Sequence, residues 1–294
     1  MDDCDAASWL GSGVAADCLW EPLLQAYFFQ PLAGTSRALP WALAAHGARG
    51  PKTMGLPIGV VALPRAVAAG LDIRLGAAVQ RLDVGADSVT VATSAGDLLG
   101  DYCIVAATAP AARDLLGTQA TPAESALLAT GYSATVTVAL GLHRSYRLPN
   151  RLADVHGVSI PRRERRNVSA VAVESNKTSG WTGPGPLLLA FLAGEAGGRL
   201  LGESDPLLTD LVLEELEPYF PGVTSAVTLT HVTRWSQTEP LSPVGRAKAV
   251  AAYRAGWIAT RRVLLAGDYT GLPWTDSAAA SGQWAAERLR RRVA

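Results

Sequence analysis

The stretch LLAGDYTGLPWTDSAAASG, residues 264–282, carries most of what the sequence reveals about this chain. Its apolar start is typical of a buried strand that ends at Gly267-Asp268. In an open α/β sheet, ligands bind at the carboxyl ends of the strands. A glycine there lets a ligand approach the backbone closely, and a carboxylate accepts hydrogen bonds from hydroxyl groups. The stretch therefore predicts a ligand-binding edge at Gly267 and Asp268.

The same stretch continues through a Gly-Leu-Pro turn into a predicted final helix. Thr275 or Asp276 is expected to cap that helix, and small residues from 277 to 281 leave room for a flat ligand against its N-terminus. A helix N-terminus offers free N–H groups and a partial positive charge, which suit the electron-rich pyrimidine edge of a reduced flavin. A plain strand–turn–helix capped by Asp276 explains these residues equally well.

Strand patterns and helix patterns alternate along the rest of the chain. The predicted strands are 73–75, 77–84, 87–93, 102–108, 134–142, 186–194 and 226–235. The predicted helices are 5–29 with Pro22 near the start of a second helix, 59–72 ended by Gly70, 110–117, 204–220 and 277–294. The continuous apolar run at 102–108 predicts a strand buried on both faces. Strands followed by helices indicate an α/β fold.

Composition narrows the class of protein. The 294 residues are 49% hydrophobic, and the formal net charge is +0, so nothing favours a nucleic-acid partner. The three cysteines, Cys4, Cys18 and Cys103, are too widely spaced for a metal site, and their low number is typical of a reducing compartment. No leader pattern opens the sequence, and no run of about 18 apolar residues predicts a transmembrane segment. The sequence predicts a soluble, cytoplasmic, globular protein.

A second glycine motif matches the dinucleotide-binding fingerprint but lacks the strand that should precede it. Residues 11–16, GSGVAA, match the dinucleotide fingerprint G-x-G-x-x-A. That fingerprint follows a buried strand, whereas the residues before Gly11 are polar and helical in pattern. We expect a break between two helices here.

Residues 264–286 resemble the C-terminal FAD motif of the flavin-containing amine oxidase superfamily, L-A-G-D-x, a short turn, then E-G-A-x-x-S-G-x-x-A-A. Gly267 and Asp268 match its Gly-Asp, and Ser281 with Gly282 match its Ser-Gly. Asp276 stands where glutamate is usual. Ser277 replaces the usual glycine at the point of closest approach to the flavin.

The resemblance extends along nearly the whole chain. Residues 59–83 and 100–116 are similar to segments of the family's FAD domain, in which Val79 would contact the adenine through its backbone. Residues 159–194 and 233–250 resemble protoporphyrinogen-oxidase-like members, and 5–31 resemble a helical substrate-domain segment that desaturases share.

The resemblance implies a two-domain α/β architecture. An α+β substrate-binding domain, 1–54 and 119–259, would be inserted in a partial Rossmann-like FAD-binding domain, 55–118 and 260–294. The family's opening βαβ unit with its G-x-G-x-x-G has no counterpart here, so the chain is expected to be a truncated, C-terminal portion with an exposed parallel sheet edge. It would be the second half of a split enzyme beside a separate N-terminal FAD-binding polypeptide, a gene fragment, or a degenerate relative.

The resemblance also implies a function, namely hydride transfer from a C–H or C–N bond of a small hydrophobic organic substrate to flavin N5. Asp268 would bind the ribityl or phosphate-proximal hydroxyls, and Thr275, Asp276, Ser277 and Ala278 would present backbone N–H groups to the ring. The ring of Trp274 would pack against the flavin, and the ring of Trp235 would pack against the flavin or the substrate. No catalytic residue is assigned; Lys177 and His231 are acid–base candidates through their segments alone.

Two points stay open at this stage. A non-catalytic subunit that completes a flavoenzyme with its partner is the alternative function. The apolar, Trp-rich first fifty residues, which include Trp9, Trp20, Trp41, Phe28 and Phe29, suit a large greasy substrate such as a porphyrinogen or isoprenoid, and equally an ordinary helical core.

Overall fold

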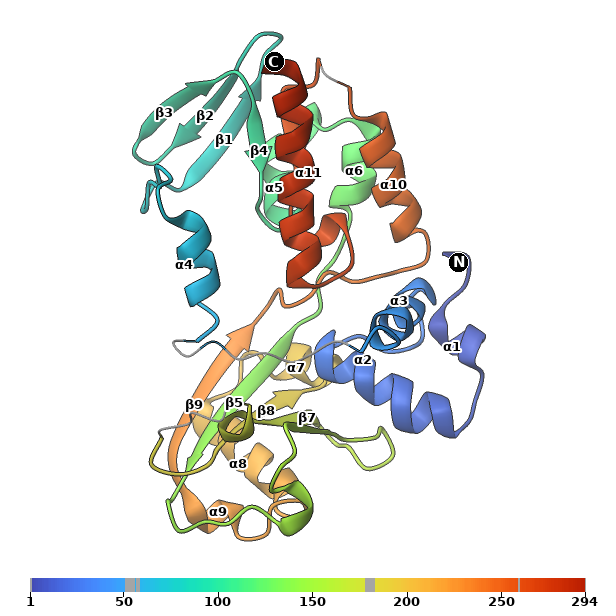
Figure 1. Ribbon diagram of the computed structural model, residues 1–294, viewed down its shortest axis with the longest axis vertical. Coiled ribbons are helices and arrows are strands. Elements are labelled where there is room, and N and C mark those ends of the chain that lie inside the picture. Colours follow the sequence, from blue (N-terminus) through green and yellow to red (C-terminus); the bar gives the residue numbers. More distant parts are fainter. Residues whose placement is uncertain (1, 51–55, 57–58, 178–182, 259, 294) are drawn as a thin grey trace.

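The chain forms two packed parts, drawn one above the other in Figure 1. The computed structural model describes residues 2–50, 56, 59–177, 183–258 and 260–293. A five-stranded sheet builds the lower part, and a three-stranded and a two-stranded sheet build the upper part. Helices pack on these sheets, so the α/β class predicted from the sequence is confirmed.

The lower sheet is antiparallel throughout, with the strand order β6-β7-β8-β5-β9. Its strands are β5 (Thr135–Leu142), β6 (Gly157–Ser159), β7 (Val168–Val173), β8 (Leu187–Leu192) and β9 (Val227–Trp235). All six residues of β7 are buried. Helix α8 (Asp205–Leu216) covers the sheet with Leu208, Val212 and Leu216, which recur every four residues and are fully buried.

The other helices of the lower part are short. They are α1 (Ala6–Leu10), the π-helical turn η1 (Ala16–Trp20), α2 (Glu21–Tyr27), α3 (Ala38–Gly47), the 3₁₀ turns η3 (Asn150–Leu152) and η4 (Glu174–Asn176), α7 (Gly194–Leu200) and α9 (Val223–Ala226). Helix α2 packs on β7, where Arg165 pairs with Glu21 at 2.5 Å and both side chains are more than nine-tenths buried. Such a pair costs desolvation and therefore fixes the position of α2 more than it stabilises the fold.

The upper part contains an antiparallel meander and one parallel pair. The meander comprises β1 (Val79–Val84), β2 (Val89–Thr93) and β3 (Gly96–Gly100), and the parallel pair comprises β4 (Cys103–Val105) and β10 (Val263–Leu265). Around them lie α4 (Ala62–Ala68), α5 (Ala109–Leu116), η2 (Gly117–Gln119), α6 (Pro122–Leu128), α10 (Arg246–Gly256), η5 (Asp268–Thr270) and α11 (Thr275–Val293).

One apolar cluster joins β4 and β10 to α5, α6 and α10. The helices α6 and α10 fall inside the range 119–259, yet they pack against strands of the segments 55–118 and 260–294. The domain boundaries inferred from the resemblance stay predictions.

Two antiparallel connecting segments link the upper and lower parts. The Ser133 N–H donates to the carbonyl of Glu239 and the Thr238 N–H to the carbonyl of Ser133, both at 2.8 Å. The buried amide of Gln30 donates to the carbonyl of Pro240 at 3.1 Å and accepts from the Ser242 N–H at 2.9 Å. These bonds hold the two connecting segments together where they pass between the upper and lower parts.

Most predicted elements form, with three differences. No strand forms at 73–75, and the predicted helix 5–29 is broken into α1, η1 and α2, with Pro22 in the first turn of α2 as expected. The run 102–108 forms only the three-residue strand β4, and the side chain of Ile104 is 37% exposed. The strand is not buried on both faces, because the face to which Ile104 points is incompletely covered by other described elements.

The glycines of GSGVAA form the expected break. Gly11 ends α1 with φ 67°, Gly13 has φ 153°, and neither has another atom close to where a Cβ would lie. No strand precedes them in the described residues, and a phosphate-binding turn is therefore ruled out by context. Within the described part of the chain, no helix has the length and apolar character that crossing a membrane requires.

Candidate functional site

Gly267 ends strand β10 in a conformation that favours glycine. The three residues of β10 are fully buried, and Gly267 has φ 139°. A Cβ at this position would lie 3.0 Å from the ring of Tyr269. The Gly267 N–H donates to the Oγ of Ser281 on α11 at 2.8 Å, which ties the end of the strand to the final helix. The strand end predicted from the sequence is therefore present, and because Gly267 has no side chain its backbone is not covered by one.

Asp268 is held from two sides at this edge. Its Oδ1 accepts a hydrogen bond from the Tyr132 hydroxyl at 2.7 Å, and its carbonyl accepts one from the guanidinium of Arg246 at 3.3 Å. Arg246 also donates to the carbonyl of Gly271 at 2.7 Å. Burial, reinforced by the hydrogen bond to Asp268, raises the pKa of Tyr132 well above its ordinary value. Tyr132 therefore stays a neutral donor that orients the carboxylate.

Arg246 keeps its charge in this setting. Burial lowers the pKa of Arg246 to about 10, while the charge of Asp268 and, to a smaller degree, that of Asp2 oppose that shift. At neutral pH the guanidinium remains protonated and stabilises the turn from Asp268 to Gly271. Its Nε has no partner in the described structure, so the group is held by its two terminal nitrogens.

Glu239 is a second carboxyl group in this cluster, and the sequence did not indicate it. Burial, followed by the charge of Asp268, raises its pKa to about 8. At neutral pH Glu239 is therefore mostly protonated, and a nearby acidic group is one of the causes that favour the neutral form of a carboxyl group. Residues 239 and 268 lie far apart in sequence, and only the crossing between the two parts brings them together.

The first turn of α11 supplies backbone donors next to Asp268. Helix α11 begins at Thr275, and the carbonyl of Trp274 accepts from the Ala278 N–H at 3.2 Å, so neither Thr275 nor Asp276 occupies the expected capping position. The carboxylate of Asp276 accepts instead from the Ser277 N–H at 2.9 Å. The N–H groups of Thr275 and Asp276 have no acceptor among the described residues, and both residues are exposed.

Trp274 faces the helices of the lower part. Its ring lies 6.3 Å from that of Phe28 and 5.8 Å from that of His46, and it packs on a small cluster with Leu24 and Leu39. The tryptophan therefore joins α2 and α3 to the start of α11. Of the aromatic residues near the start of the chain, Phe28 and Phe29 are buried, whereas Trp9 and Trp41 are 40% and 48% exposed.

The other predicted site residues lie apart from this cluster in the described contacts. Val79 opens β1 opposite Thr93 and is 43% exposed. Trp235 ends β9 and donates from Nε1 to Thr137 at 3.4 Å. Lys177 pairs with Glu174 at 2.6 Å, and His231 is exposed on β9. The structure thus brings together Gly267, Asp268 and residues 274–278. In the described contacts, none of these residues touches Val79, Trp235, Lys177 or His231.

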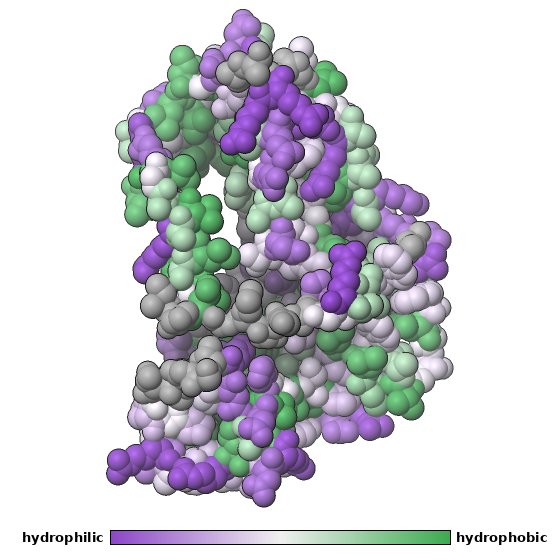
Figure 2. Space-filling view, viewed as in Figure 1, coloured by the Kyte–Doolittle hydropathy of each residue, from purple (hydrophilic) through white to green (hydrophobic). Residues whose placement is uncertain are grey.

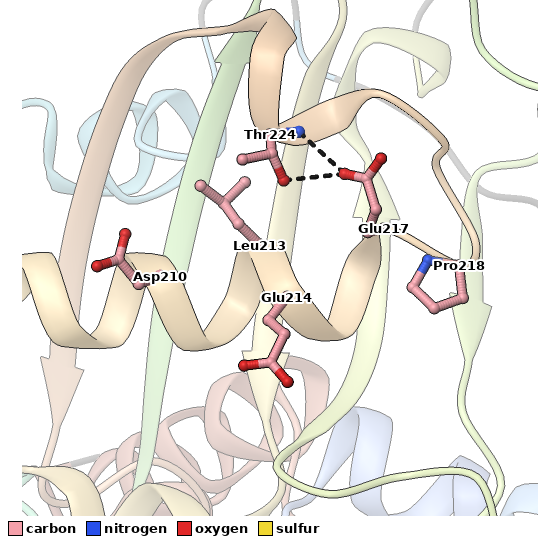
Figure 3. A pocket seen from close by; sticks show the side chains of 6 residues that line it. All are labelled: Asp210, Leu213, Glu214, Glu217, Pro218 and Thr224. Atoms are coloured by element: carbon pink, nitrogen blue, oxygen red, sulfur yellow. Dashed lines mark hydrogen bonds between the residues drawn. The ribbon is translucent and has the colours of Figure 1, made fainter.

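A surface hollow lies apart from this cluster, beside α8. It has a volume of about 670 Å³ and is lined by Asp210, Leu213, Glu214, Glu217, Pro218 and Thr224. Figure 3 shows these side chains. The carboxylate of Glu217 accepts from the N–H groups of Gly222 and Thr224 and from the Thr224 hydroxyl, and these bonds lower its pKa. Glu217 therefore stabilises the turn after α8.

The fold is that of an α/β protein in which Gly267 and Asp268 lie at the end of a buried parallel strand. The profile of the flavin containing amine oxidoreductase family matches residues 13–290, and the chain belongs to that family. Its match spans both parts of the molecule.

Two solved structures share the fold. One is described as a protoporphyrinogen oxidase from Exiguobacterium sp. 255-15, with a TM-score of 0.77 and 21% identity over 98% of this chain and 67% of that one. The other is cyclohexylamine oxidase from Brevibacterium oxydans IH-35A, with a TM-score of 0.68 and 16% identity over 98% of this chain and 68% of that one. No curated protein matches the sequence significantly.

Proposed function

We propose that this chain is part of an FAD-dependent oxidoreductase that transfers a hydride from a small hydrophobic organic substrate to the flavin. Membership of the flavin containing amine oxidoreductase family supports a flavin cofactor and an oxidoreductase activity. The observation that carries the proposal is the edge where Gly267, the fixed carboxylate of Asp268 and the free N–H groups of α11 meet. When bound, the flavin would supply the redox chemistry.

The residues at this edge fit the cofactor. The hydroxyl groups of the flavin's ribityl chain need a hydrogen-bond acceptor. The carboxylate of Asp268 provides one, in an orientation set by Tyr132. The edge of the flavin ring that gains negative charge on reduction needs hydrogen-bond donors. The N–H groups of Thr275 and Asp276 provide them, and the helix dipole adds partial positive charge. Asp276 itself works against this with its negative charge, which the Ser277 N–H only partly satisfies. Val79 and Trp235 stay proposals, the first for the adenine and the second for the substrate.

The first experiment is a visible absorption spectrum of the purified chain before and after incubation with FAD. We expect a flavin band that survives desalting, and we expect the Asp268→Ala variant to bind FAD at least tenfold more weakly because the hydroxyl acceptor is gone. Tyr132→Phe should weaken binding less, since the carboxylate remains and only its orientation is loosened.

Asp97→Ala is the matched control, because Asp97 is an exposed aspartate on β3. It should bind FAD as the wild type does. Equal affinities for the wild type and Asp268→Ala would refute the assigned role of this edge in binding FAD. A substrate screen in which the flavin-loaded chain never bleaches in the absence of oxygen would contradict the proposed hydride transfer.

A second candidate function is that of a non-catalytic subunit that completes a flavoenzyme with a separate flavin-binding polypeptide. The parallel pair β4–β10 favours it, since an isolated two-stranded parallel sheet is rare. A colourless chain that takes up FAD only after the partner is added would support this candidate over the first.

A further inference from the structure

Helix α11 packs on the rest of the molecule by one face. Ser281 and Ala285 are fully buried on this face, whereas Gln283 and Glu287 are exposed. Figure 2 shows the hydrophilic outer surface of the upper half of the helix, in the same view as Figure 1. Residues four apart lie on the same side of a helix, so Ser277 faces the same way as Ser281, one turn nearer the start. The contacts of this face therefore set the position of α11.

The two serines contact the two ends of the turn that carries Asp268. At one end, the Oγ of Ser281 accepts from the Gly267 N–H at 2.8 Å. At the other end, a Cβ added to Gly271 would lie 2.9 Å from the Cβ and 3.3 Å from the Oγ of Ser277. Carbon atoms pack best at about 3.5–4.0 Å, so the space between these two residues holds one side chain and not two.

The conformation of Gly271 does not itself require glycine. Its φ is −154° and its ψ is −150°, an extended backbone that residues with side chains also adopt. Ser277, rather than the backbone, therefore excludes a side chain at position 271. Gly267 differs, because its φ of 139° favours glycine whatever packs beside it.

Helix α10 holds the same turn from another side. Arg246, which is more than nine-tenths buried, donates to the carbonyls of Gly271 at 2.7 Å and Asp268 at 3.3 Å. Arg254 donates to the carbonyl of Thr270 at 3.1 Å. Hydrogen bonds from a charged donor are among the stronger ones in proteins, so a shift of the turn away from α11 would break several of them.

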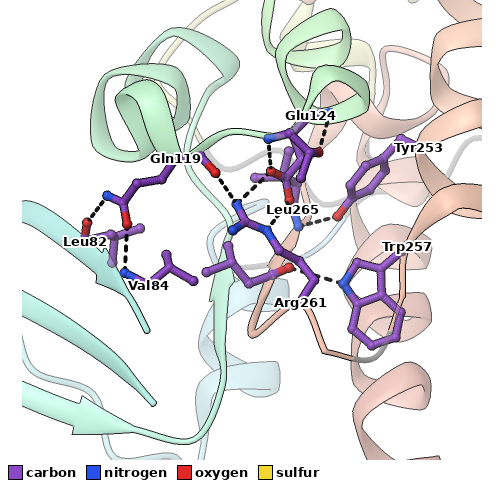
Figure 4. Close-up of polar contacts among 10 residues, drawn as sticks. Leu82, Val84, Gln119, Glu124, Tyr253, Trp257, Arg261 and Leu265 are labelled. Atoms are coloured by element: carbon purple, nitrogen blue, oxygen red, sulfur yellow. Dashed lines mark hydrogen bonds and ion pairs between the residues drawn. The ribbon is translucent and has the colours of Figure 1, made fainter. Parts of the chain in front are cut away.

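The strand that leads into the turn is fixed by the same helix. The Leu265 N–H donates to the hydroxyl of Tyr253 at 2.6 Å, and the carbonyl of Val263 accepts from Nε1 of Trp257 at 3.2 Å (Figure 4). Tyr253 belongs to α10, and Trp257 directly follows it. Because α10 fixes both strand and turn, a side chain added at position 271 would displace the first turn of α11 instead.

That first turn contains the N–H groups of Thr275 and Asp276, which have no acceptor among the described residues. We propose that Ser277 is a positioning residue of the flavin site: packed against Gly271, it fixes these N–H groups relative to the carboxylate of Asp268, so that one cofactor reaches both. The glycine usual at position 277 in the family motif has no Cβ to make this contact. The inference rests on the proposed function and deepens it.

A double-mutant cycle between the two positions tests the proposal. We expect Gly271→Ala to bind FAD at least tenfold more weakly, because the added methyl group displaces the start of α11. Ser277→Gly should bind at least threefold more weakly, because the contact is lost. The double variant Gly271→Ala, Ser277→Gly should return to within twofold of the wild type, since one side chain again fills the space. Ser277→Ala should match the wild type, because it keeps the Cβ.

Hydrogen exchange in the flavin-free chain reads the start of the helix directly. The Ala278 N–H donates to the carbonyl of Trp274 at 3.2 Å. Gly271→Ala should speed exchange of the Ala278 amide at least tenfold, the double variant should restore it, and the Ala285 amide should stay unchanged. Gly202→Ala is the control, because no atom lies within 4 Å of a Cβ added there, and it should match the wild type in both measurements.

Three results would overturn the proposal. The first is a Ser277→Gly variant that binds FAD as tightly as the wild type. The second is a double variant as weak as Gly271→Ala or, where Gly271→Ala alone does not fold, a double variant that does not fold either. The third is restored exchange at Ala278 without restored FAD affinity. If the proposed function itself fails, the wild type takes up no FAD while the exchange cycle still shows the contact, and the positioning role falls with it.

Discussion

At the scale of single residues, the site combines the oriented side chain of Asp268 with a second carboxyl group, Glu239, whose pKa is raised to about 8. Asp268 is fixed by Tyr132 and faces the charge of Arg246, whereas Glu239 is half-buried with no hydrogen bond to its carboxyl group in the described structure. The sequence motif L-A-G-D pointed to Asp268 through its position at a strand end. No pattern pointed to Glu239, because its role depends on where the two connecting segments cross.

The raised pKa of Glu239 predicts a pH dependence of stability. In the unfolded chain this carboxyl group ionises near 4.5, and in the folded chain near 8. The folded state therefore holds the extra proton between these values, and the free energy of unfolding falls as the pH rises through this window. We expect Glu239→Gln to be more stable than the wild type at pH 9 by about 1–3 kcal/mol, after allowance for partial exposure, and equal to it near pH 4.

Urea unfolding followed by circular dichroism at a series of pH values measures this effect. Glu203→Gln, at an exposed glutamate, is the control and should follow the wild type at every pH. Parallel curves for Glu239→Gln and the wild type would show that the folded pKa of Glu239 is ordinary.

At the scale of elements, strand β10 depends on α10 for one of its edges. Tyr253 is buried, and its hydroxyl is the acceptor for the buried N–H of Leu265, which no strand pairs. Local rules do not predict such a contact, and α10 itself was not among the helices predicted from the sequence. By contrast, α6 and α8 begin where their N-cap residues indicate, Thr121 and Ser204, because those bonds are local.

We expect Tyr253→Phe to lower the free energy of unfolding by about 1–3 kcal/mol, because it leaves the buried Leu265 N–H without an acceptor. Chemical denaturation gives the value, and hydrogen exchange at Leu265 should become faster. Tyr27→Phe, at a tyrosine that is 65% exposed, is the control and should be neutral. An unchanged stability of Tyr253→Phe would mean that another group or a water satisfies this amide.

At the scale of the whole molecule, the start of the chain stabilises a helix near its end. The buried carboxylate of Asp2 accepts from the Ser36 hydroxyl at 2.7 Å and from the N–H groups of Gly245 at 2.9 Å and Lys248 at 3.1 Å, and so caps α10. Burial alone would raise the pKa of Asp2, but these hydrogen bonds outweigh it and lower the pKa below its ordinary value. The cap therefore stabilises the fold above about pH 4 and is lost as the pH falls through the folded pKa.

We expect Asp2→Ala to destabilise the protein by about 1–2 kcal/mol at pH 7 and to have no effect once the carboxyl is protonated in both states. Thermal unfolding at pH 7 and in strong acid checks both parts. Asp101→Ala, at an exposed aspartate, should match the wild type at both. A loss of the same size in acid would mean that the aspartate contributes by packing rather than by its charge.

The sequence by itself determined the features that depend on near neighbours in the chain. The strand ending at Gly267-Asp268, the long final helix and the break at GSGVAA follow from glycine conformation, apolar periodicity and local capping, and the structure has all three. The run 102–108 was predicted as fully buried from its apolar residues alone. That prediction was wrong for Ile104, because burial on both faces depends on layers packed against both sides of the sheet, and apolar residues in the strand do not show whether those layers are present.

Only the tertiary structure decided which residues form the site and which surfaces stay open. Tyr132, Glu239 and Arg246 join Asp268 through the crossing of two segments that are about a hundred residues apart in sequence, and Trp274 turns to α2 and α3. Contacts of this kind depend on long-range packing, in which each side chain has many partners to choose from. For the same physical reason, the sequence gives no sign that the side chains of Tyr253 and Trp257 close the outer edge of β10. An exposed parallel edge was expected from the resemblance, and β4 has β10 as its one strand neighbour among the described residues.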